Sequence, residues 1–165
     1  MAKGQLIVIS GPSGVGKSTL IRSLTAKLQR QPFFSVSATT RKMRPGEIDH
    51  VNYHFITQAE FDRMVAQNEF LEHATYAAHS YGTPAAPILA QLEAGRDVLL
   101  DIEVQGALQV KRSYPDAVLI FIAAPSFGEL EHLLRARGDP AEDAVRLRLQ
   151  TARREYEQAN FDDYI

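Results

Sequence analysis

The amino-acid sequence predicts an α/β domain in which a parallel β-sheet is flanked by helices. Short apolar, β-branched runs alternate with helix-patterned segments, as is typical of parallel strands joined by helical crossovers. A glycine-rich segment separates the first such run from the first helical pattern, and folds of this class bind ligands at the carboxyl ends of their strands. The length of 165 residues suits one domain with a single hydrophobic core.

The first strand is expected at Leu6 to Ser10, where the side chains are apolar and β-branched. From Lys17 to Arg30 the apolar residues recur at helical spacing, which predicts a helix directly after the glycine-rich segment. A second short strand is expected at Phe33 to Ala38. These elements form the first part of a predicted core that covers residues 1–38 and 88–136.

The stretch from Arg41 to Pro87 differs in composition from the segments before it, because charged, Tyr and His residues are interspersed with apolar ones. We interpret residues 39–87 as an inserted lobe. Its expected elements are a strand at Tyr53–Ile56, a helix at Gln58–Gln67 with Thr57 as N-cap, a strand at Phe70–Tyr76, and turns at 44–46 and 81–84.

The core resumes with two apolar strands, expected at Asp97–Asp101 and Ala117–Ile122, each followed by a helix that starts near Gln105 or Ser126. From Asp139 to Gln158 the chain is charged and Arg-rich, which predicts a partly exposed helix. Residues of about 137–150, with a hinge at 138–140, are expected to form a mobile lid. The last four residues resemble the start of another strand.

Composition narrows the classes of function. Hydrophobic residues make up 45% and charged residues 23%, as in ordinary globular domains. The net charge of −2 predicts no partner among nucleic acids or membrane surfaces. The chain has no Cys, which excludes disulfides, zinc–thiolate sites and cysteine nucleophiles, and it shows no signal-peptide pattern. We therefore expect a cytoplasmic protein.

One motif points directly to nucleotide chemistry. Residues 11–18 fit the phosphate-loop pattern G-x-x-x-x-G-K-[ST] and read Gly11, Pro12, Ser13, Gly14, Val15, Gly16, Lys17 and Ser18. In this pattern backbone N–H groups cradle a phosphate, Lys pairs with the β- and γ-phosphate oxygens, and the hydroxyl holds Mg²⁺. The motif follows a strand and precedes a helix, so it favours a nucleoside triphosphate site over a merely structural turn.

Three further groups are candidates for a site. Asp101 ends an apolar strand, where a carboxylate can face the phosphates and help to hold Mg²⁺, although it could also cap a helix. The basic residues between 41 and 44, with Tyr53 and Tyr81, suit the monophosphate of an acceptor, or form a solvated basic loop. Of the Arg residues after 134, one or two are expected to act in phosphoryl transfer, and the rest to lie at the surface. The five His residues show no metal-binding spacing.

Taken in order, these motifs resemble the guanylate kinase family over essentially the whole chain. The resemblance implies transfer of a phosphoryl group from ATP to GMP with Mg²⁺, on a P-loop core with a GMP-binding lobe and a lid. The matching segments are residues 11–18, Ser37–Arg41, Arg44–Glu47, Glu69–Glu72, Tyr81–Thr83, Asp101–Gly106 and Arg135–Gly138.

The resemblance also implies a role for individual residues. Glu72 would accept the N1–H and N2 amino donors of guanine, so adenine would leave its carboxylate unpaired, and Ser37 and Thr83 would face the base. The GMP site would further include Arg41, Arg44, Tyr53, Tyr81 and Asp101. ATP would bind residues 11–18 and Arg137, the metal would bind Ser18 and Asp101, and Lys17, Arg41, Arg137 and Arg148 would be catalytic.

Two features depart from the family pattern. Glu103 stands where the family usually has Asp, so a contact near GMP is expected to shift by one methylene. Family members also continue past the final strand, through an Asn near the adenine and a C-terminal helix, and we expect these parts to be absent from this chain. The enzyme is expected to act as a monomer or homodimer.

Two other readings remain open from the residues. A non-catalytic guanylate kinase-like module would use the same lobe to bind phosphorylated proteins, but such modules typically have a degraded phosphate loop, whereas Lys17 and Ser18 are present here. Another nucleoside monophosphate kinase would need a different base-selecting residue from Glu72.

Overall fold

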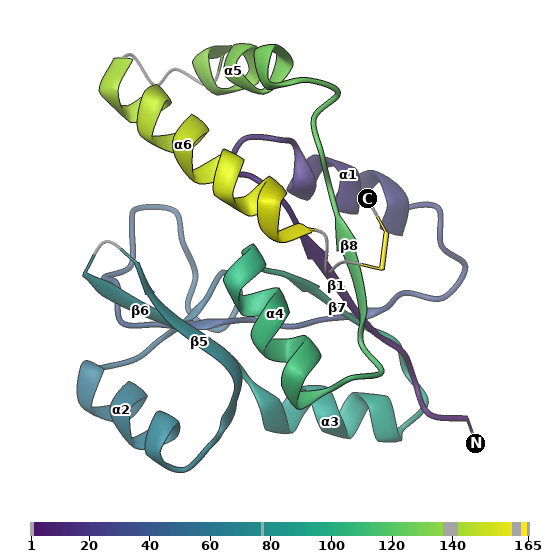
Figure 1. The fold of residues 1–165 in the computed structure, drawn as a ribbon. Coiled ribbons are helices and arrows are strands. Elements are labelled where there is room, and N and C mark those ends of the chain that lie inside the picture. Colours follow the sequence, from purple (N-terminus) through teal and green to yellow (C-terminus); the bar gives the residue numbers. More distant parts are fainter. Residues whose placement is uncertain (1, 77, 137–141, 160–162, 165) are drawn as a thin grey trace.

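The computed structural model describes residues 2–76, 78–136, 142–159 and 163–164. Its first sheet has the strand order β2-β7-β1-β8, and every neighbouring pair is parallel, as the sequence predicts (Figure 1). The strands are β1 (Leu6–Ser10), β2 (Phe33–Phe34), β7 (Val98–Asp101) and β8 (Val118–Phe121). β1 and β7 are therefore adjacent, and their carboxyl ends meet at one edge.

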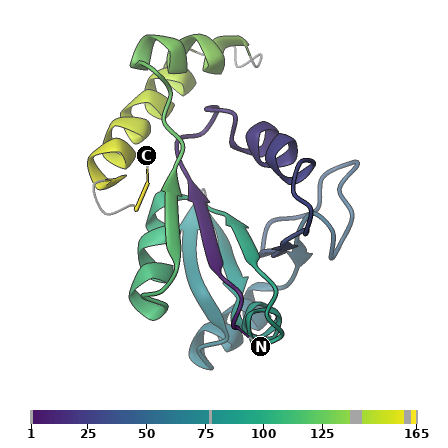
Figure 2. The ribbon, with the colours of Figure 1, turned by 90° about the vertical axis from the view of Figure 1, so that its right-hand side faces the viewer.

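Helices cover both faces of this sheet. Figure 2 shows α1 (Lys17–Thr25) on one side of it and α4 (Val104–Ser113) on the other. The main core cluster combines β1, β7 and β8 with α4 and with α3 (Ala85–Glu93), through residues such as Val8, Leu92 and Val110. α5 (Phe127–Ala136) packs against α6 (Glu142–Gln158) beyond the carboxyl ends of the strands. None of the helices within the described ranges has both the length and the apolar character needed to cross a membrane.

The second sheet lies in the region of the expected lobe and has the order β4-β3-β6-β5. It consists of β3 (Ala38–Thr39), β4 (His54–Phe55), β5 (Phe70–Tyr76) and β6 (His79–Pro84), with α2 (Gln58–Ala66) between β4 and β5. β3 pairs parallel with β4, while β6 pairs antiparallel with both β3 and β5. The predicted cap of α2 is confirmed, because Thr57 Oγ1 accepts the backbone N–H of Glu60 at 3.2 Å.

The expected strand at Phe33–Ala38 proves to be two strands in different sheets. β2 pairs with β7 in the first sheet, whereas β3 pairs with β4 and β6 in the second. The backbone N–H of His54 bonds to the carbonyl of Ser37, at the point where the chain enters the second sheet. A continuous apolar run cannot reveal this change of partner, because both short strands have the same pattern.

The turn expected at residues 81–84 is wrong, since these residues belong to β6. Gly82 there makes a close approach to an aromatic ring: a Cβ on it would lie 2.8 Å from Cδ1 of Phe70. Pairing on both sides and burial of Thr83 stabilise the strand against the local turn signal. Sequence analysis also did not predict α3, whose Ile88 and Leu92 are fully buried.

α1 ends at Thr25 and is shorter than the helix expected to reach Arg30, because the backbone N–H groups of Lys27 and Leu28 bond to carbonyls three residues back, as in a closing turn, and no longer four residues back. The side chain of Gln31 donates to the carbonyls of Thr25 (2.7 Å) and Leu28 (3.3 Å) and so binds carbonyls at and beyond the end of the helix. Leu24 and Leu28 are each 48% exposed, so the apolar stripe that suggested a longer helix is only partly packed.

Near the end of the chain, Tyr164 forms a parallel bridge with Ile120 of β8, in line with the expectation of a further strand there. The Asp163 carboxylate accepts the backbone N–H of Leu119 at 2.8 Å and pairs with Lys111 of α4 at 3.0 Å. These contacts join the C-terminal residues to the first sheet.

Candidate active site

The phosphate-loop motif forms the connection from β1 to α1. Gly16 caps the helix with a left-handed backbone (φ 99°), a conformation that glycine adopts without strain. Gly11 lies so close to the backbone just after β8 that a Cβ would be 2.4 Å from the Ile122 carbonyl oxygen. The Lys17 ammonium donates to the carbonyl of Gly11 at 2.7 Å and to that of Pro12 at 3.3 Å. The motif therefore has the strand–loop–helix context that phosphate binding requires.

Asp101 ends β7 beside this loop, in register with Ile9 of β1. Its carboxylate accepts a hydrogen bond from the Ser18 hydroxyl at 3.5 Å. Burial raises the pKa of Asp101, while the Lys17 charge and the Ser18 hydrogen bond oppose that rise. A hydroxyl and a carboxylate side by side fit Mg²⁺, which prefers oxygen ligands and takes one or two carboxylates with substrate phosphates. Among the described residues no group of three His, Cys, Asp or Glu could hold a metal on its own.

A cavity of about 220 Å³ lies next to Asp101, where residues from the two sheets meet. It contains five of the residues predicted to bind nucleotide and three that were not predicted. The lining residues are Ser37, Tyr53, Glu72, Ala74, Tyr81, Asp101, Ile102 and Glu103. Because Asp101 also contacts the phosphate loop, the cavity and the loop belong to one continuous site.

Glu72 is the most deeply buried acid in this cavity, with only 6% of the residue exposed. It lies on β5, and its Oε1 accepts the hydroxyl of Thr83 from β6. The pKa of Glu72 is raised to about 7, mainly by burial; the hydrogen bond from Thr83 opposes the rise, and the nearby Glu103 charge adds to it. A buried carboxylate with an open cavity in front of it is suited to accept N–H donors from a ligand.

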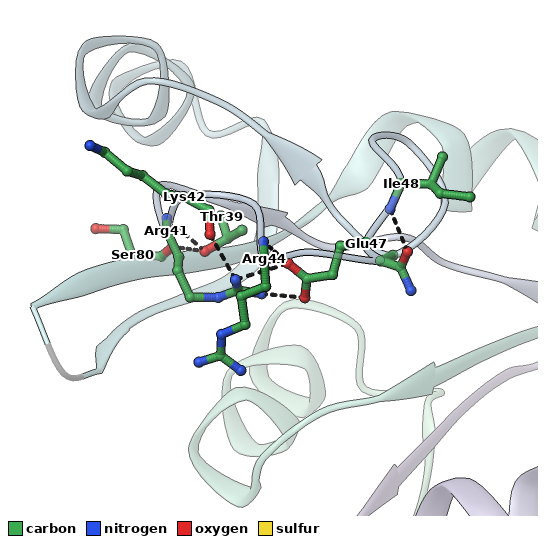
Figure 3. Close-up of polar contacts among 8 residues, drawn as sticks. Thr39, Arg41, Lys42, Arg44, Glu47, Ile48 and Ser80 are labelled. Carbon is green, nitrogen blue, oxygen red and sulfur yellow. Dashed lines mark hydrogen bonds and ion pairs between the residues drawn. The ribbon is translucent and has the colours of Figure 1, made fainter.

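The Arg41 guanidinium lies beside the cavity and is held by Glu47. Figure 3 shows the two side chains facing each other, with Arg41 donating to both carboxylate oxygens at 2.7 and 3.0 Å. Glu47 also accepts the backbone N–H of Arg44 at 2.7 Å, and these bonds lower the pKa of Glu47 to about 2. The carboxylate thus fixes both the guanidinium and the loop that follows it.

Aromatic rings lie close to the Arg41 guanidinium, beside the cavity. The Arg41 guanidinium lies 5.5 Å from the ring centre of Tyr53 and 5.6 Å from that of Phe55. The rings of Tyr53 and Tyr81 meet edge-on with their centres 6.1 Å apart. Burial raises the pKa of Tyr53, so its hydroxyl stays a hydrogen-bond donor. The sequence grouped these residues as an anion site, and the fold brings Arg41, Tyr53 and Tyr81 together.

The candidates Arg44 and Arg148 do not line the cavity. The Arg44 residue is exposed, and Figure 3 draws its side chain extending away from Glu47. Arg148 is half-buried on α6, and Arg137 lies outside the described residues. Their roles, and those of the other site residues named from the sequence, stay predictions.

Sequence analysis missed some residues of the site. Ala74 and Ile102 carry no chemical signal, because small and apolar residues occur throughout any core. Glu103 was noticed only as a departure from the family pattern, yet it lines the cavity, and burial raises its pKa. Glu47 is named from the sequence only as the end of the segment Arg44–Glu47 and is given no role; its spacing of three residues from Arg44 is a signal that could have indicated one.

Comparisons with known proteins agree with this arrangement. The family model described as guanylate kinase matches residues 3–165. A guanylate kinase from a Nostoc species is 49% identical over 98% of this chain and 81% of the relative, and one from Thermosynechococcus vestitus is 51% identical over 98% and 85%. The crystal structure of guanylate kinase from Anaplasma phagocytophilum superposes with a TM-score of 0.74 at 30% identity, covering 99% of this chain and 76% of that one. The family model matches nearly every residue, and the relatives are about half identical over most of their own length. The fold of the chain is also that of a guanylate kinase. This chain therefore belongs to the guanylate kinase family.

Proposed function

We propose that this chain transfers the γ-phosphoryl group of ATP to GMP and so forms ADP and GDP. The observation that carries the proposal is the cavity containing the buried Glu72 carboxylate, which reaches Asp101 beside the phosphate loop. An acceptor base held at Glu72 would direct its phosphate toward a triphosphate on the loop. The reading as a non-catalytic module is not favoured, because the relatives are guanylate kinases and the phosphate loop is intact.

Guanine selection follows from the chemistry of Glu72. An ionised carboxylate only accepts hydrogen bonds, and guanine presents two adjacent donors, N1–H and the N2 amino group. Thr83 occupies one lone pair of the carboxylate and holds its orientation. Adenine lacks this donor pair, so a bound adenine would leave a buried carboxylate unsatisfied, which is strongly unfavourable.

The phosphate groups meet a separate set of donors. Lys17 and the backbone N–H groups of residues 11–18 would bind the phosphates of ATP, while Arg41, Arg44, Tyr53 and Tyr81 would hold the phosphate of GMP. Ser18 and Asp101 would hold the Mg²⁺ that binds with ATP. The ion would neutralise part of the negative charge on the phosphate oxygens.

In the transfer step, an oxygen of the GMP phosphate attacks the γ-phosphorus in line with the bond to ADP. That bond breaks as the new one forms, and ADP leaves with its electron pair, so no covalent enzyme intermediate is needed. Lys17, Arg41, Arg137 and Arg148 would stabilise the charge that develops on the transferred group. Residues 39–87 would act as the GMP-binding lobe and residues of about 137–150 as a lid, in a cytoplasmic enzyme.

The proposed reaction is tested by offering Mg-ATP with GMP, AMP, CMP or UMP and measuring ADP formation, with nucleotide binding followed by calorimetry. We expect turnover with GMP that exceeds turnover with the other three by about 10³-fold or more, since unpaired buried polar groups give discrimination of that size. Preferred use of another acceptor would contradict the role of Glu72. GMP binding without turnover would instead favour the interaction module.

The pKa of Glu72 gives the reaction a characteristic pH dependence. With a pKa of about 7 in the free enzyme, about a tenth of Glu72 is ionised at pH 6 and about nine tenths at pH 8. Binding of guanine requires the ionised Glu72 carboxylate, so we expect kcat/KM for GMP to rise about tenfold from pH 6 to pH 8. The GMP phosphate, with a second pKa of about 6, titrates in the same pH range. The Glu72→Gln variant keeps that titration and loses the one of Glu72, so it serves as the control. Identical profiles for the two proteins would contradict the prediction.

A further inference from the structure

We propose that Gly106 of α4 is a positioning residue for guanine selection, because its missing side chain leaves the space that the Glu72 carboxylate occupies. The proposal rests on the proposed function and deepens it. It assigns a specificity role to a residue that neither lines the cavity nor carries a functional group.

The contact between the two residues is unusually close. A Cβ built on Gly106 would lie 2.7 Å from Oε2 of Glu72 and 3.1 Å from its Cδ. Separations below 3.0 Å essentially never occur for real Cβ atoms, so even a methyl group requires something to move. The third neighbour, Cδ1 of Ile102 at 3.3 Å, closes the space from another direction.

Glu72 has little freedom to give way. It is buried, and Oε1, the oxygen remote from this contact, accepts the hydroxyl of Thr83. Thr83 is itself fully buried on β6, which pairs with strands on both sides. A shift of the carboxylate away from α4 would therefore strain or break the Thr83 bond and change the direction in which the oxygens face the cavity.

Retreat of α4 is opposed as well, because the Gln109 side chain is bonded to the backbone of β5 at the residue after Glu72. The Gln109 amide accepts the N–H of His73 at 3.1 Å and donates to its carbonyl at 3.0 Å. The Ser113 hydroxyl also lies 3.4 Å from the carbonyl of Leu71, although the carbonyls of Gln109 (3.1 Å) and Val110 (3.2 Å) in α4 itself are closer. β5 is an edge strand of the second sheet, so the two Gln109 bonds satisfy backbone groups of His73 on its unpaired side.

The spacing of the three α4 residues explains why glycine is needed at this point. Positions 106, 109 and 113 follow each other at i, i+3 and i+7, so they lie on one face of the helix. Gln109 holds that face against β5, and Gly106 then lies against the carboxylate. Gly106 lies in the first turn of α4, and glycine is a weaker helix former than alanine, so its presence there does not follow from helix propensity.

The first experiment compares Gly106→Ala with Gly128→Ala. Gly128 lies in α5, where a Cβ would meet nothing closer than the Ser126 hydroxyl at 3.7 Å, so it controls for a general effect of alanine in a helix. We expect Gly106→Ala to lower kcat/KM for GMP at least tenfold, with KM for ATP changed less than twofold. Gly128→Ala should change neither value more than twofold. Equal losses toward ATP and GMP, or an unchanged value for GMP, would overturn the proposal.

A double-mutant cycle then asks whether Gly106 acts through Glu72. In a Glu72→Ala background the clashing oxygen is absent, so Gly106→Ala should change the residual kcat/KM for GMP less than twofold. The same tenfold loss in both backgrounds would show that Gly106 acts independently of Glu72 and would refute the proposal. If Gly106→Ala instead lowers the melting temperature, the added Glu72→Ala substitution must restore it, and failure to do so would also refute it.

The failure of this inference is distinguishable from that of the proposed function. If the unmodified chain does not phosphorylate GMP, the proposed function is wrong. If it phosphorylates GMP and Gly106→Ala does so equally well, only the role of Gly106 is wrong.

Discussion

Replacing Lys17 with alanine is expected to lower kcat for GMP phosphorylation by about 10³-fold, while the protein stays folded. The Lys17 ammonium belongs to the phosphate loop at the start of α1 and is the one cation that the motif dedicates to the β- and γ-phosphates. Charge on these oxygens changes most in the transition state, so loss of this cation should affect kcat more than ATP affinity. ADP formation at saturating ATP and GMP is the measurement.

A matched control is Lys27→Ala, which removes the same functional group from an exposed position beyond the end of α1. Its turnover should stay within twofold of the unmodified chain. Thermal unfolding of both variants checks the fold, since Lys17 also donates to the carbonyls of Gly11 and Pro12. Turnover of Lys17→Ala equal to that of the control would remove the phosphate loop from the mechanism.

The second large effect is expected from Glu72→Gln, which should lower kcat/KM for GMP by about 10²- to 10³-fold and leave KM for ATP nearly unchanged. The amide has the same shape as the carboxylate but replaces one acceptor oxygen with a donor, so one guanine donor would face another donor in a buried cavity. Thr83 can still donate to the remaining oxygen, so the fold should persist.

Glu69→Gln is the control for this substitution. It makes the same chemical change three residues earlier in the chain, at a residue that forms a surface ion pair with Arg63. Such exposed pairs contribute little, so GMP use should stay within twofold. The measurement is kcat/KM for GMP and for AMP with both variants. A Glu72→Gln protein that keeps its preference for GMP over AMP would show that another residue selects the base.

The parts of the fold that follow from local pattern were predictable. β1, β5 and β7, and the helix capped by Thr57, combine strong periodicity with clear boundary residues, and the structure has them where the sequence predicts them. The phosphate loop was equally clear, because its chemistry requires fixed residues within eight positions. β6 was mistaken for a turn because its glycine and proline have local turn propensities, and only pairing with β3 and β5 overrides them.

The candidate site was predictable in its residue types more than in its geometry. Tyr53, Glu72, Tyr81 and Asp101 were named from motifs, and they line one cavity. Glu47 and Gly106 end two of the matching segments, but the sequence predicts no role for either, because nothing nearby in the chain shows which side chain each will contact. Each acquires a role only through its neighbour: Glu47 binds the Arg41 guanidinium, and Gly106 makes room for Glu72.

The sequence by itself determined the family, the alternation of strands and helices that implies a parallel sheet, and the presence of a phosphate-binding loop. Each of these depends on residues close together along the chain. Only the tertiary structure decided that the strand after α1 splits between two sheets, that Glu72 is buried beside Thr83, and that α4 limits where its carboxylate can lie. The physical reason is that burial, pKa and contact distance depend on residues 11 to 36 positions apart, whose approach no local pattern encodes.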